Sequence, residues 1–335
     1  MRKKPFENTN FILMQSFKIS PYDAGVRLER FLKKTFPQIP LASLQKFLRT
    51  KKVALLRHGE RQKIENSLEI LQNDEIRIFF DPDAFTPLPP KRAKDFSAIL
   101  KNPKFQDLRI AYEDEHLMVI EKPAGVAVHP GSKVQFGHSL VDFCIARERT
   151  KNPECPEPKL AHRLDKDTSG LIIVAKNDAV LRKVVEMVQD GSIKKEYLAL
   201  VRGNVTPKKG SIRDSLQKTE GSKHTKILVS EDGKRSVTHY EVDSYFPAIN
   251  ASLVRVVLET GRMHQIRVHF AEKGHPLAGD DAYGGFAWNR DLKKQFGLAR
   301  QFLHAHQLTF THPISGKPLK ITSPLPKDLE KVVGK

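Results

Sequence analysis

The residues best suited to chemistry lie in one short stretch, Ala161 to Lys176, with the sequence AHRLDKDTSGLIIVAK. A charged, hydroxyl-rich turn here runs directly into the apolar strand Leu171 to Ala175. One interpretation is a capped turn, in which Asp165 or Thr168 accepts hydrogen bonds from backbone N–H groups and Gly170 adopts a backbone angle that other residues resist. The other is that a rigid strand holds one carboxylate in position for a reaction. Taken alone, the stretch favours the capped turn.

Two further segments contain polar side chains that a surface role explains poorly. Tyr197 lies inside the predicted strand of KKEYLALVRG beside apolar residues, although tyrosine is also common in strands for structural reasons. In ETGRMHQIRVHFAEKGHPLAGDDAYG, the basic side chains that crowd a short apolar helix are Arg262, His264, Arg267 and His269. Solvent exposure can explain two of them. All four together are typical of a pocket or an RNA groove.

The chain lacks the usual signatures of cofactor and metal enzymes. It contains no GxxxxGK[ST], GxGxxG or HExxH pattern, and no HxE followed by PCxxC. His264 and His269 are five residues apart, a spacing that does not make a helical metal pair. Cys144 and Cys155 are the only cysteines and form no CxxC pair, which excludes a zinc site of cysteines and favours a reduced, cytoplasmic protein. We expect no cofactor and no metal.

The charge distribution predicts a polyanionic partner. The formal net charge is +18, from 57 Lys and Arg against 39 Asp and Glu. Residues 1–65 hold 15 Lys or Arg against 5 Asp or Glu, so more than half of the excess lies in a fifth of the chain. This concentration favours a nucleic-acid-binding module over a generally solvated surface. No segment approaches the ~20 apolar residues needed to cross a bilayer, and no membrane association is expected.

Residues 18–80 have the pattern of a compact α/β module. Helices are expected over 27–36 and 41–52, each with apolar residues at i, i+3 and i+4. The apolar faces are formed by Leu28, Phe31, Leu32, Leu44, Phe47 and Leu48. Ser43 is the expected N-cap of the second helix. The exposed side of that helix carries Lys46, Arg49, Lys51 and Lys52. Short strands are predicted at 53–56 and 75–80.

The remaining chain predicts a linker and one larger domain. Residues 81–107 form the linker, since 81–104 contain five prolines and no sustained period. A single α+β domain on a mostly antiparallel sheet is expected over 108–325. Its strands are predicted near 117–122, 171–176, 196–203, 238–242, 253–259 and 318–323. Its helices are predicted at 138–149, 178–190 and 263–273, the last with Met263, Ile266 and Phe270 on one face and Gly274 at C′. Residues 1–17 and 326–335 are predicted to be tails.

Together the motifs resemble a known family. HRLDKDTSGLIIVAK, KEYLALVRG and GRMHQIRVHFAEKGHPLAGDDAYG, in this order, resemble the RluA-type family of pseudouridine synthases, and YEDEHLMVIEKPAGVAVHPGS resembles the segment before the aspartate motif. GVRLERFL, SLQKFLRTKKV and NDEIRI resemble the S4 RNA-binding domain, with Lys51 where that domain usually has glycine and Leu56 where a polar turn residue is usual. HRLDKDTSG and the C-terminal FLHAHQLTFTHPISGKPLKITSPLP look most like the branch that modifies large-subunit ribosomal RNA.

The resemblance implies an isomerase that breaks the N1–C1′ bond of uridine, rotates the uracil and rejoins it at C5 without a redox step. Asp165 matches the family's catalytic aspartate, and Asp167 is a weaker candidate. Arg267 matches the arginine that pairs with the aspartate. Tyr197 matches the tyrosine that packs on uracil, and help in removing the C5 proton is a second role considered for it. Arg163 matches the arginine that fills the gap left by the extruded base. The predicted RNA-binding residues are Arg163, His162, Thr168, Arg262 and His264, with Lys46, Arg49, Lys51 and Lys52 in the S4-like module.

Other functions stay open at this point. A non-catalytic S4-type ribosome-assembly protein would have the same charge, but it predicts the loss of a catalytic residue. A metal-dependent nuclease needs clustered carboxylates, and Asp280 and Asp281 are adjacent residues that project differently. A pseudouridine synthase acting on tRNA is a further alternative. We expect a monomer that binds large-subunit ribosomal RNA.

Overall fold

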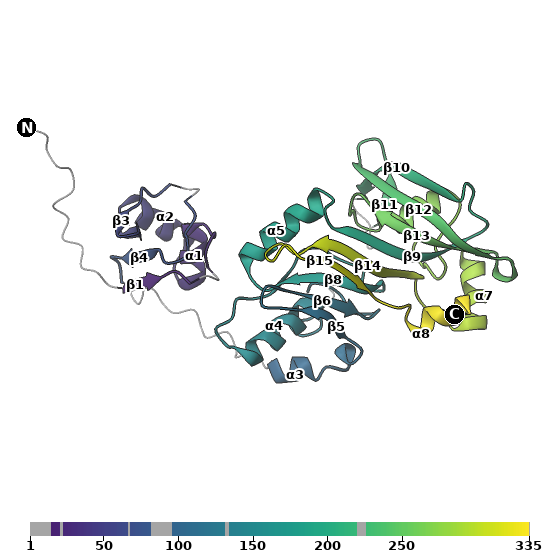
Figure 1. Ribbon diagram of the computed structural model, residues 1–335, viewed down its shortest axis with the longest axis horizontal. Coiled ribbons are helices and arrows are strands. Elements are labelled where there is room, and N and C mark those ends of the chain that lie inside the picture. The colour runs from purple at the N-terminus through teal and green to yellow at the C-terminus, as the bar shows by residue number, and fades with distance from the viewer. Residues whose placement is uncertain are drawn as a thin grey trace, which may run out of the picture. The chain divides into compact units, whose positions relative to one another are not determined.

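The structure, a computed structural model, describes residues 15–334 apart from 21–22, 66–67, 82–95, 131–133 and 220–225. Contacts divide the chain into two compact units, and the main division falls between Asp95 and Phe96. This point lies inside the predicted linker. Each unit is described by itself, with its elements labelled in Figure 1.

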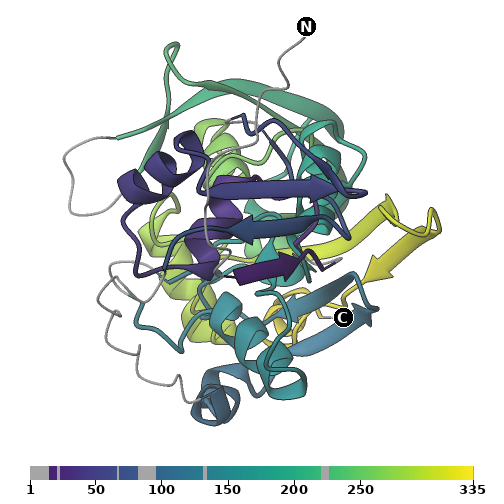
Figure 2. The ribbon, with the colours of Figure 1, turned by 90° about the vertical axis from the view of Figure 1, so that its left-hand side faces the viewer.

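The N-terminal unit is a small sheet with two helices. Within its described residues, four strands pair antiparallel in the order β1-β4-β2-β3, and Figure 2 shows them side by side in purple and blue. The elements are β1 (Gln15–Lys18), α1 (Leu28–Thr35), α2 (Leu41–Arg49), β2 (Val53–Arg57), β3 (Glu60–Arg61) and β4 (Glu75–Ile78). The apolar faces predicted for the helices are confirmed, since their side chains form or contact the core of this unit.

Two details of this unit differ from the prediction. Ser43 is not the N-cap of α2, because the helix already begins after Pro40, whose backbone is extended (φ −57°, ψ 142°). Residues 15–17 belong to β1, which pairs with β4, rather than to a tail. Lys51, just after α2, has a φ of 60°, the left-handed conformation that glycine adopts readily. The helix end therefore has the backbone shape that the usual glycine would give.

The C-terminal unit is built on one large sheet. Eleven strands of its described residues pair in the order β11-β10-β12-β13-β9-β14-β8-β6-β5, with β7 on β8 and β15 on β14. The β14–β8 pair is parallel and the other pairs of this part of the chain are antiparallel. The expected α+β fold on a mixed, mostly antiparallel sheet is thus confirmed. The strands are β5 (Arg109–Glu113), β6 (Leu117–Lys122), β7 (Lys159–Leu160), β8 (Ser169–Ala175), β9 (Lys194–Arg202), β10 (Lys209–Lys218), β11 (Ile227–Val229), β12 (Lys234–Phe246), β13 (Ala251–Leu258), β14 (Leu303–Thr311) and β15 (Pro318–Thr322).

Helices cover both faces of this sheet. They are α3 (Phe96–Leu100), η2 (Pro103–Phe105), α4 (Leu140–Lys151), α5 (Asp178–Gln189), η3 (Pro247–Ile249), α6 (Gln265–Glu272), α7 (Phe286–Phe296) and α8 (Lys327–Val333). Ile172 and Val174 of β8 lie in the core that includes α4, whereas Leu171 and Ile173 lie in a separate cluster with α5. Figure 1 shows these two helices on opposite sides of β8. The uninterrupted apolar run of β8 follows from burial on both faces, since successive side chains of a strand alternate.

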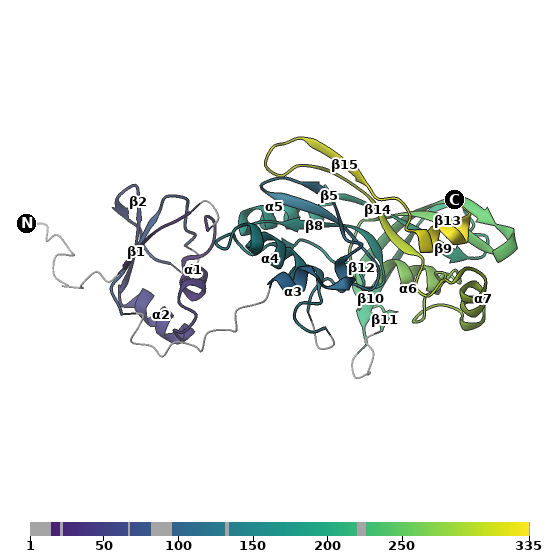
Figure 3. The ribbon, with the colours of Figure 1, turned by 90° about the horizontal axis from the view of Figure 1, so that it is seen from below.

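Strand β9 uses the same alternation to place a candidate residue. Leu198 and Leu200 belong to the cluster that includes α7 and α8. Tyr197 and Ala199 belong instead to the main core, together with Ile266 of α6. Figure 3 shows α6 and α7 beside the part of the sheet that carries β9 and β13. Tyr197 therefore faces the same side of the sheet as the helix that carries the predicted active-site arginine.

Both ends of the predicted catalytic domain extend further than expected. Residues 96–107, predicted as linker, form α3 and η2 and bury Ile99 and Phe105 in the main core. Residues 327–333, predicted as part of a tail, form α8. Its buried side chains are Leu329, Val332 and Val333. Their spacing of i, i+3 and i+4 gives even this short helix an apolar face, which attaches it to the domain.

Helix α6 is shorter at its start than predicted. It begins after His264, which has a left-handed φ of 55° and so cannot continue the helix backward. Met263 consequently lies outside the helix, whereas Ile266 and Phe270 are buried as expected. Gly274 follows the last turn with a φ of 78°, in the predicted C′ position.

Candidate active site

The turn before β8 is fixed by its contact with β14. Gly170 has a φ of 112°, and a Cβ atom there would lie 2.2 Å from the carbonyl oxygen of Ala305. Glycine is therefore required where the parallel strands β8 and β14 approach each other. Beside it, the Ser169 hydroxyl shares a hydrogen bond of 3.0 Å with Nδ1 of buried His304. The turn thus starts from a rigid point in the sheet.

Side chains from distant segments also hold the turn backbone. Lys122 is 1% exposed, and its Nζ donates to the carbonyl oxygens of Pro123, Val126 and Lys166, each at 2.9 Å. These three acceptors use all three donors of an ammonium group. Buried Lys122 therefore connects the loop after β6 to the turn that carries the candidate aspartate.

A second connection reaches the turn from the segment before β14. Nη1 of Arg300 donates to the carbonyl oxygen of Asp167 at 3.1 Å, while Nε and Nη2 of the same guanidinium bind Asp328 in α8 at 2.7 and 3.1 Å. Next to it, Nε2 of Gln301 donates to the Thr168 hydroxyl at 3.3 Å. Residues 165–168 are thereby held from two sides.

This framework presents Asp165 to a buried arginine. Nη1 of Arg267 donates to Oδ2 of Asp165 at 3.1 Å, and the Asp165 side chain is 16% exposed. On its other edge, Arg267 makes a bidentate pair with Asp280 through Nε (2.7 Å) and Nη2 (2.9 Å). Asp281, by contrast, is exposed, so the two adjacent aspartates do not form a carboxylate cluster. A nuclease would need both carboxylates at one metal site. Here Asp280 is buried and bound to Arg267, whereas Asp281 lies at the surface.

The ion pairs keep both buried partners charged. Burial opposes the charge of Arg267, yet the hydrogen bonds and charge of Asp280, together with Asp165, raise the pKa of the guanidinium above its ordinary value. Burial likewise opposes ionisation of Asp280, but Arg267 and the backbone N–H groups of Ala282 and Tyr283 lower the pKa of that carboxyl. A fixed, ionised Arg267 in turn holds Asp165 in one orientation.

One cavity of about 220 Å³ collects the predicted catalytic-domain residues. The residues predicted from sequence that line it are Asp165, Tyr197, Arg267, Arg163, His162, Thr168, Arg262 and His264. They come from the turn before β8, from β9 and from the start of α6. Lys46, Arg49, Lys51 and Lys52 belong to the N-terminal unit, on and just after α2.

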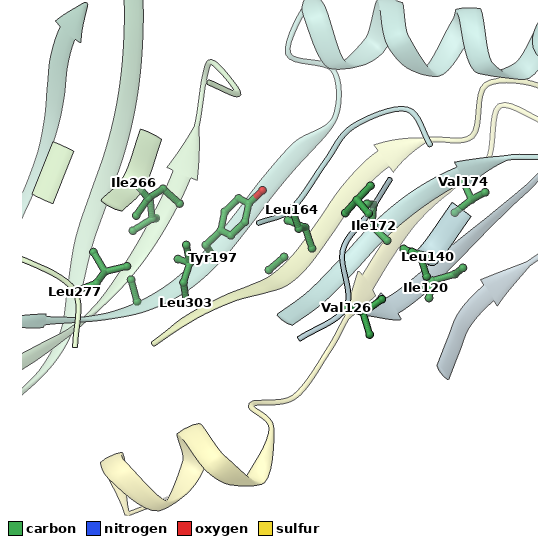
Figure 4. Close-up of a cluster of buried hydrophobic side chains, with 14 of the residues drawn as sticks. Ile120, Val126, Leu140, Leu164, Ile172, Val174, Tyr197, Ile266, Leu277 and Leu303 are labelled. Carbon is green, nitrogen blue, oxygen red and sulfur yellow. The ribbon is translucent and has the colours of Figure 1, made fainter. Parts of the chain in front are cut away.

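Tyr197 forms an apolar wall of the cavity. It is 5% exposed and projects from β9 among Leu164, Ile266 and Leu303 (Figure 4). Among the described residues, none hydrogen-bonds its hydroxyl group. Burial and the charge of Asp165 raise the pKa of Tyr197 well above its ordinary value, so the phenol stays protonated. Its ring can pack on a planar base, and its hydroxyl can donate a hydrogen bond but is a poor base.

Three of the predicted RNA-binding residues already have partners inside the fold: His162, Thr168 and His264, whose Nδ1 lies 2.9 Å from the hydroxyl oxygen of Tyr283. Nε2 of His162 accepts a hydrogen bond from the backbone N–H of Ile173 at 3.1 Å, and burial lowers the pKa of His162 to about 3, so its ring is neutral. Thr168 is 2% exposed and bonded to Gln301. Arg163 and Arg262 are exposed at the rim of the cavity. RNA contact by these residues stays a prediction, and the partners of the first two support a role in shaping the turn.

The sequence interpretation missed several residues of the site. Lys195 lines the cavity, is 5% exposed and has its pKa lowered by burial. Its position two residues before Tyr197 in a strand was an available signal, because alternation places both on one face. Asp280 and Tyr283 were inside a quoted motif, but nothing in the local sequence pairs either with Arg267. Lys122 was hidden because a lysine after a strand usually predicts a surface residue.

The described residues contain no group of three or more His, Cys, Asp or Glu side chains that could hold a metal ion. In the same part of the chain, no helix combines the length and apolar character needed to cross a membrane. The cavity brings together the oriented carboxylate of Asp165, two buried basic side chains, Arg267 and Lys195, and the aromatic wall of Tyr197. Such a set can place a nucleophile or base against a flat ring.

The profile of the RNA pseudouridylate synthase family matches residues 116–272, a span that contains the turn, β9 and α6. With the full-length relatives below, this match shows that the chain belongs to that family, and it is therefore an isomerase that converts uridine to pseudouridine in RNA. The resemblance found from the motifs is confirmed. The match also excludes the metal-dependent nuclease, which would be a member of a different enzyme family.

Relatives known by sequence align with nearly the whole chain, and two solved structures align with about two thirds of it. "Ribosomal large subunit pseudouridine synthase C" of Haemophilus ducreyi is 35% identical over 98% of this chain and 98% of its own length. The protein of the same name from Escherichia coli K12 is 35% identical over 95% of each. Among solved structures, human RNA Pseudouridylate Synthase Domain Containing 4 is 25% identical with a TM-score of 0.54, covering 67% of this chain and 91% of that one. Human RNA Pseudouridylate Synthase Domain Containing 1 is 27% identical with a TM-score of 0.53, covering 68% and 87%.

Proposed function

We propose that the protein isomerises specific uridines of large-subunit ribosomal RNA, with Asp165 as the catalytic carboxylate. The observation that carries this proposal is the junction of Asp165, Arg267 and Tyr197 in one cavity, with Arg267 paired to Asp165 at 3.1 Å. The names of the relatives support the choice of RNA. The cavity of about 220 Å³ is of the size expected for one extruded nucleoside rather than for a stacked duplex.

The geometry supports a division of work between the two oxygens of Asp165. Oδ2 accepts from Arg267, whereas Oδ1 has no hydrogen-bond partner among the described residues. Oδ1 is therefore available to attack the sugar or the base, or to remove a sugar proton, while the N1–C1′ bond breaks. Arg267 holds the carboxylate in one orientation throughout the step. No electron transfer is required.

The cavity walls account for the rest of the reaction. Tyr197 packs against the freed uracil while it turns to present C5 to the sugar, so that the base does not diffuse away. Removal of the C5 proton needs an acceptor, and the protonated phenol of Tyr197 is poorly suited to that task. The Asp165 carboxylate in the same cavity, free again once C5 has joined the sugar, can take this proton. Arg163, exposed at the cavity rim, is the side chain that would fill the space left in the RNA by the target base.

The N-terminal unit is proposed to supply affinity and placement on a structured RNA, as an S4-like domain over residues 18–80. Its support is the excess positive charge of residues 1–65 and the basic side of α2. Residues 108–325 are proposed as the catalytic domain, with α3 and α8 as parts of the same folded unit. We also propose a monomer acting in the cytoplasm: Asp165, Tyr197 and Arg267 meet within a single chain, and two cysteines without a CxxC pair favour a reduced compartment. Light scattering of the free protein and of its complex with RNA would test the monomer.

Mapping of pseudouridines tests the substrate. Ribosomal RNA and tRNA are compared between cells that lack this protein, the same cells supplied with the wild-type gene, and cells supplied with the Asp165→Asn gene. The proposal expects specific large-subunit positions to lose pseudouridine, to regain it with the wild type and not with the variant. Loss confined to tRNA would favour the alternative substrate, and an unchanged ribosomal RNA would contradict the proposal.

A further inference from the structure

His264 is the most constrained side chain at the edge of the cavity. It has a left-handed backbone (φ 55°), which is uncommon for a residue with a Cβ atom and persists only where the surroundings enforce it. Its side chain is 20% exposed and stands edge-on to the ring of Tyr283, with ring centres 5.6 Å apart. Tyr283 also carries the guanidinium of Arg267 over its ring, 5.2 Å from the centre. Tyr283 therefore contacts both the imidazole of His264 and the arginine that pairs with Asp165.

A chain of hydrogen bonds determines which nitrogen of His264 carries the hydrogen. The backbone N–H of Ile227 in β11 donates to the hydroxyl oxygen of Tyr283 at 2.9 Å. The same hydroxyl lies 2.9 Å from Nδ1 of His264. The oxygen already accepts from an amide and, among the described residues, Nδ1 is the one acceptor within hydrogen-bond distance of this hydroxyl, so we assign the hydroxyl hydrogen to Nδ1. Nδ1 is then the acceptor, and a neutral imidazole must carry its single hydrogen on Nε2.

Burial and the charged groups around the imidazole together favour the neutral form of His264. Burial is the largest influence and lowers the pKa of His264, while the carboxylates of Asp165 and Asp280 act in the opposite direction. The cations Arg267 and Arg163 add to the effect of burial. The hydroxyl of Tyr283, directed at Nδ1, also opposes protonation of that nitrogen.

The hydrogen on Nε2 faces the candidate catalytic carboxylate. Nε2 lies 3.8 Å from Oδ2 of Asp165, the oxygen that Arg267 already contacts. This distance is longer than a hydrogen bond, but contacts of this kind shorten when an active site closes on its substrate. Two donors thus flank one oxygen of Asp165 and leave the other oxygen toward the cavity.

We propose that His264 is a positioning residue whose Nε2–H, fixed by the Tyr283 hydroxyl, restrains Oδ2 of Asp165 so that Oδ1 meets the target uridine. The inference rests on the proposed role of Asp165 and extends it to a second donor and its support. Arg267 and His264 then share one task from two directions. Tyr283 connects this arrangement to β11 through two hydrogen bonds, from Ile227 N–H to the Tyr283 hydroxyl and from that hydroxyl to His264. A shift of β11 would therefore change the position of His264 beside the carboxylate.

The first test reads the hydrogen position directly. In protein labelled with ¹⁵N at histidine, the two-bond ¹⁵N–¹H correlations of His264, assigned by comparison with His264→Gln, distinguish the two neutral forms. The proposal expects the Nε2–H form in the wild type and a rise of the Nδ1–H form in Tyr283→Phe. A wild-type ring with its hydrogen on Nδ1 would overturn the proposal, whatever the enzyme's activity.

The second test measures the reaction. Under single-turnover conditions with RNA tritiated at uridine C5, His264→Leu should slow tritium release by about tenfold, the effect expected for losing one hydrogen bond to a charged group. Tyr283→Phe removes a bond between two neutral groups and should slow it by roughly threefold to fivefold. RNA affinity should stay within about twofold, because this proposal assigns the side chain of His264 to Asp165 rather than to a phosphate of the RNA. His264→Gln should recover much of the rate, since its amide NH₂ can replace Nε2–H. Tyr112→Phe removes a hydroxyl bonded to Asp114 outside the cavity and should leave the rate unchanged.

The results separate this inference from the proposed function. If the wild type releases tritium and Asp165→Asn does not, but His264→Leu and Tyr283→Phe match the wild type, the inference is wrong and the function stands. If His264→Gln is as slow as His264→Leu although both melt at the wild-type temperature, a donor at this position is not what matters. If the wild type releases no tritium from any ribosomal RNA, the proposed function fails, and the ¹⁵N measurement still decides the tautomer.

Discussion

Replacing Arg267 by methionine tests the charge balance beneath the site. The guanidinium joins Asp165 at 3.1 Å to Asp280 at 2.7 and 2.9 Å, and the Asp280 side chain is fully buried. Methionine has a similar length and no charge, so the variant leaves the Asp280 carboxylate buried without its cation. Removing one partner of such a pair costs about 3–5 kcal/mol. Because the N–H groups of Ala282 and Tyr283 still donate to Asp280, we expect a loss of about 3 kcal/mol.

The loss should depend on pH. In the wild type Asp280 has a lowered pKa, so it stabilises the fold above its unfolded pKa of about 3.9, and that contribution disappears as the pH falls through the folded value. Without Arg267, burial raises the pKa of Asp280 instead. The penalty is then present at neutral pH and is relieved when the carboxyl takes a proton. The difference in unfolding free energy between wild type and Arg267→Met should therefore shrink as the pH falls from about 7 toward 5.

Urea unfolding followed by circular dichroism at several pH values measures this difference. The double variant Arg267→Met with Asp280→Asn should recover much of the lost stability, because it removes the buried charge together with its missing partner. Arg267→Lys keeps a positive charge without the bidentate geometry and should fall between the two. A stability difference that does not change with pH, or a double variant no more stable than Arg267→Met, would refute the account of the buried pair.

Three further predictions concern substrate binding and turnover. Tyr197→Phe keeps the ring that packs on uracil and loses the hydroxyl, which can donate a hydrogen bond to the turning base. The rate of tritium release should therefore fall by roughly threefold to tenfold, while RNA affinity in a filter-binding assay stays within a few-fold; equal losses in both would contradict the assigned role. The four basic residues on and just after α2 are Lys46, Arg49, Lys51 and Lys52. Neutralising them together should weaken binding to ribosomal RNA and reduce the slope of log affinity against log salt by roughly 0.7 to 0.9 for each lost phosphate contact. Turnover at saturating RNA should change little, and an unchanged slope would show that this face is an ordinary solvated one. Arg300→Met releases the carbonyl of Asp167 and should slow turnover without weakening RNA binding, whereas Arg290→Met on the exposed side of α7 should do neither.

The sequence could predict which three segments come together. Each contains polar side chains that a surface role explains poorly, and together the three resemble the motifs of one enzyme family. The turn before β8, the strand with Tyr197 and the start of α6 do line one cavity. The capped-turn interpretation of the first segment is also partly right, since Gly170 has the expected unusual backbone angle (φ 112°) and the backbone N–H of Thr168 is satisfied within the turn by the main-chain carbonyl of Asp165 at 3.1 Å, although not by a side chain. The turn is therefore both a capped structural element and the holder of the carboxylate.

The supporting contacts could not be predicted, because they join residues far apart in the chain. Lys122 reaches the turn across 44 residues and Arg300 across 133. Such pairs depend on how β6, β8 and β14 are ordered in the sheet, and local periodicity carries no information about that order. The tail and linker boundaries were misplaced for a related reason. Short helices such as α8 have too few residues for a reliable periodic signal and are stabilised by the surface on which they pack.

The central claim is that Asp165, and not its neighbour Asp167, performs the reaction. Asp165→Asn and Asp167→Asn are nearly isosteric changes two residues apart, and each removes one negative charge from the same turn. Single-turnover release of tritium from ribosomal RNA labelled at uridine C5 compares them directly, with filter binding as the control for RNA affinity. The account predicts no release above background by Asp165→Asn, near-normal release by Asp167→Asn, and RNA affinity within a few-fold of wild type for both. Substantial release by Asp165→Asn would contradict it.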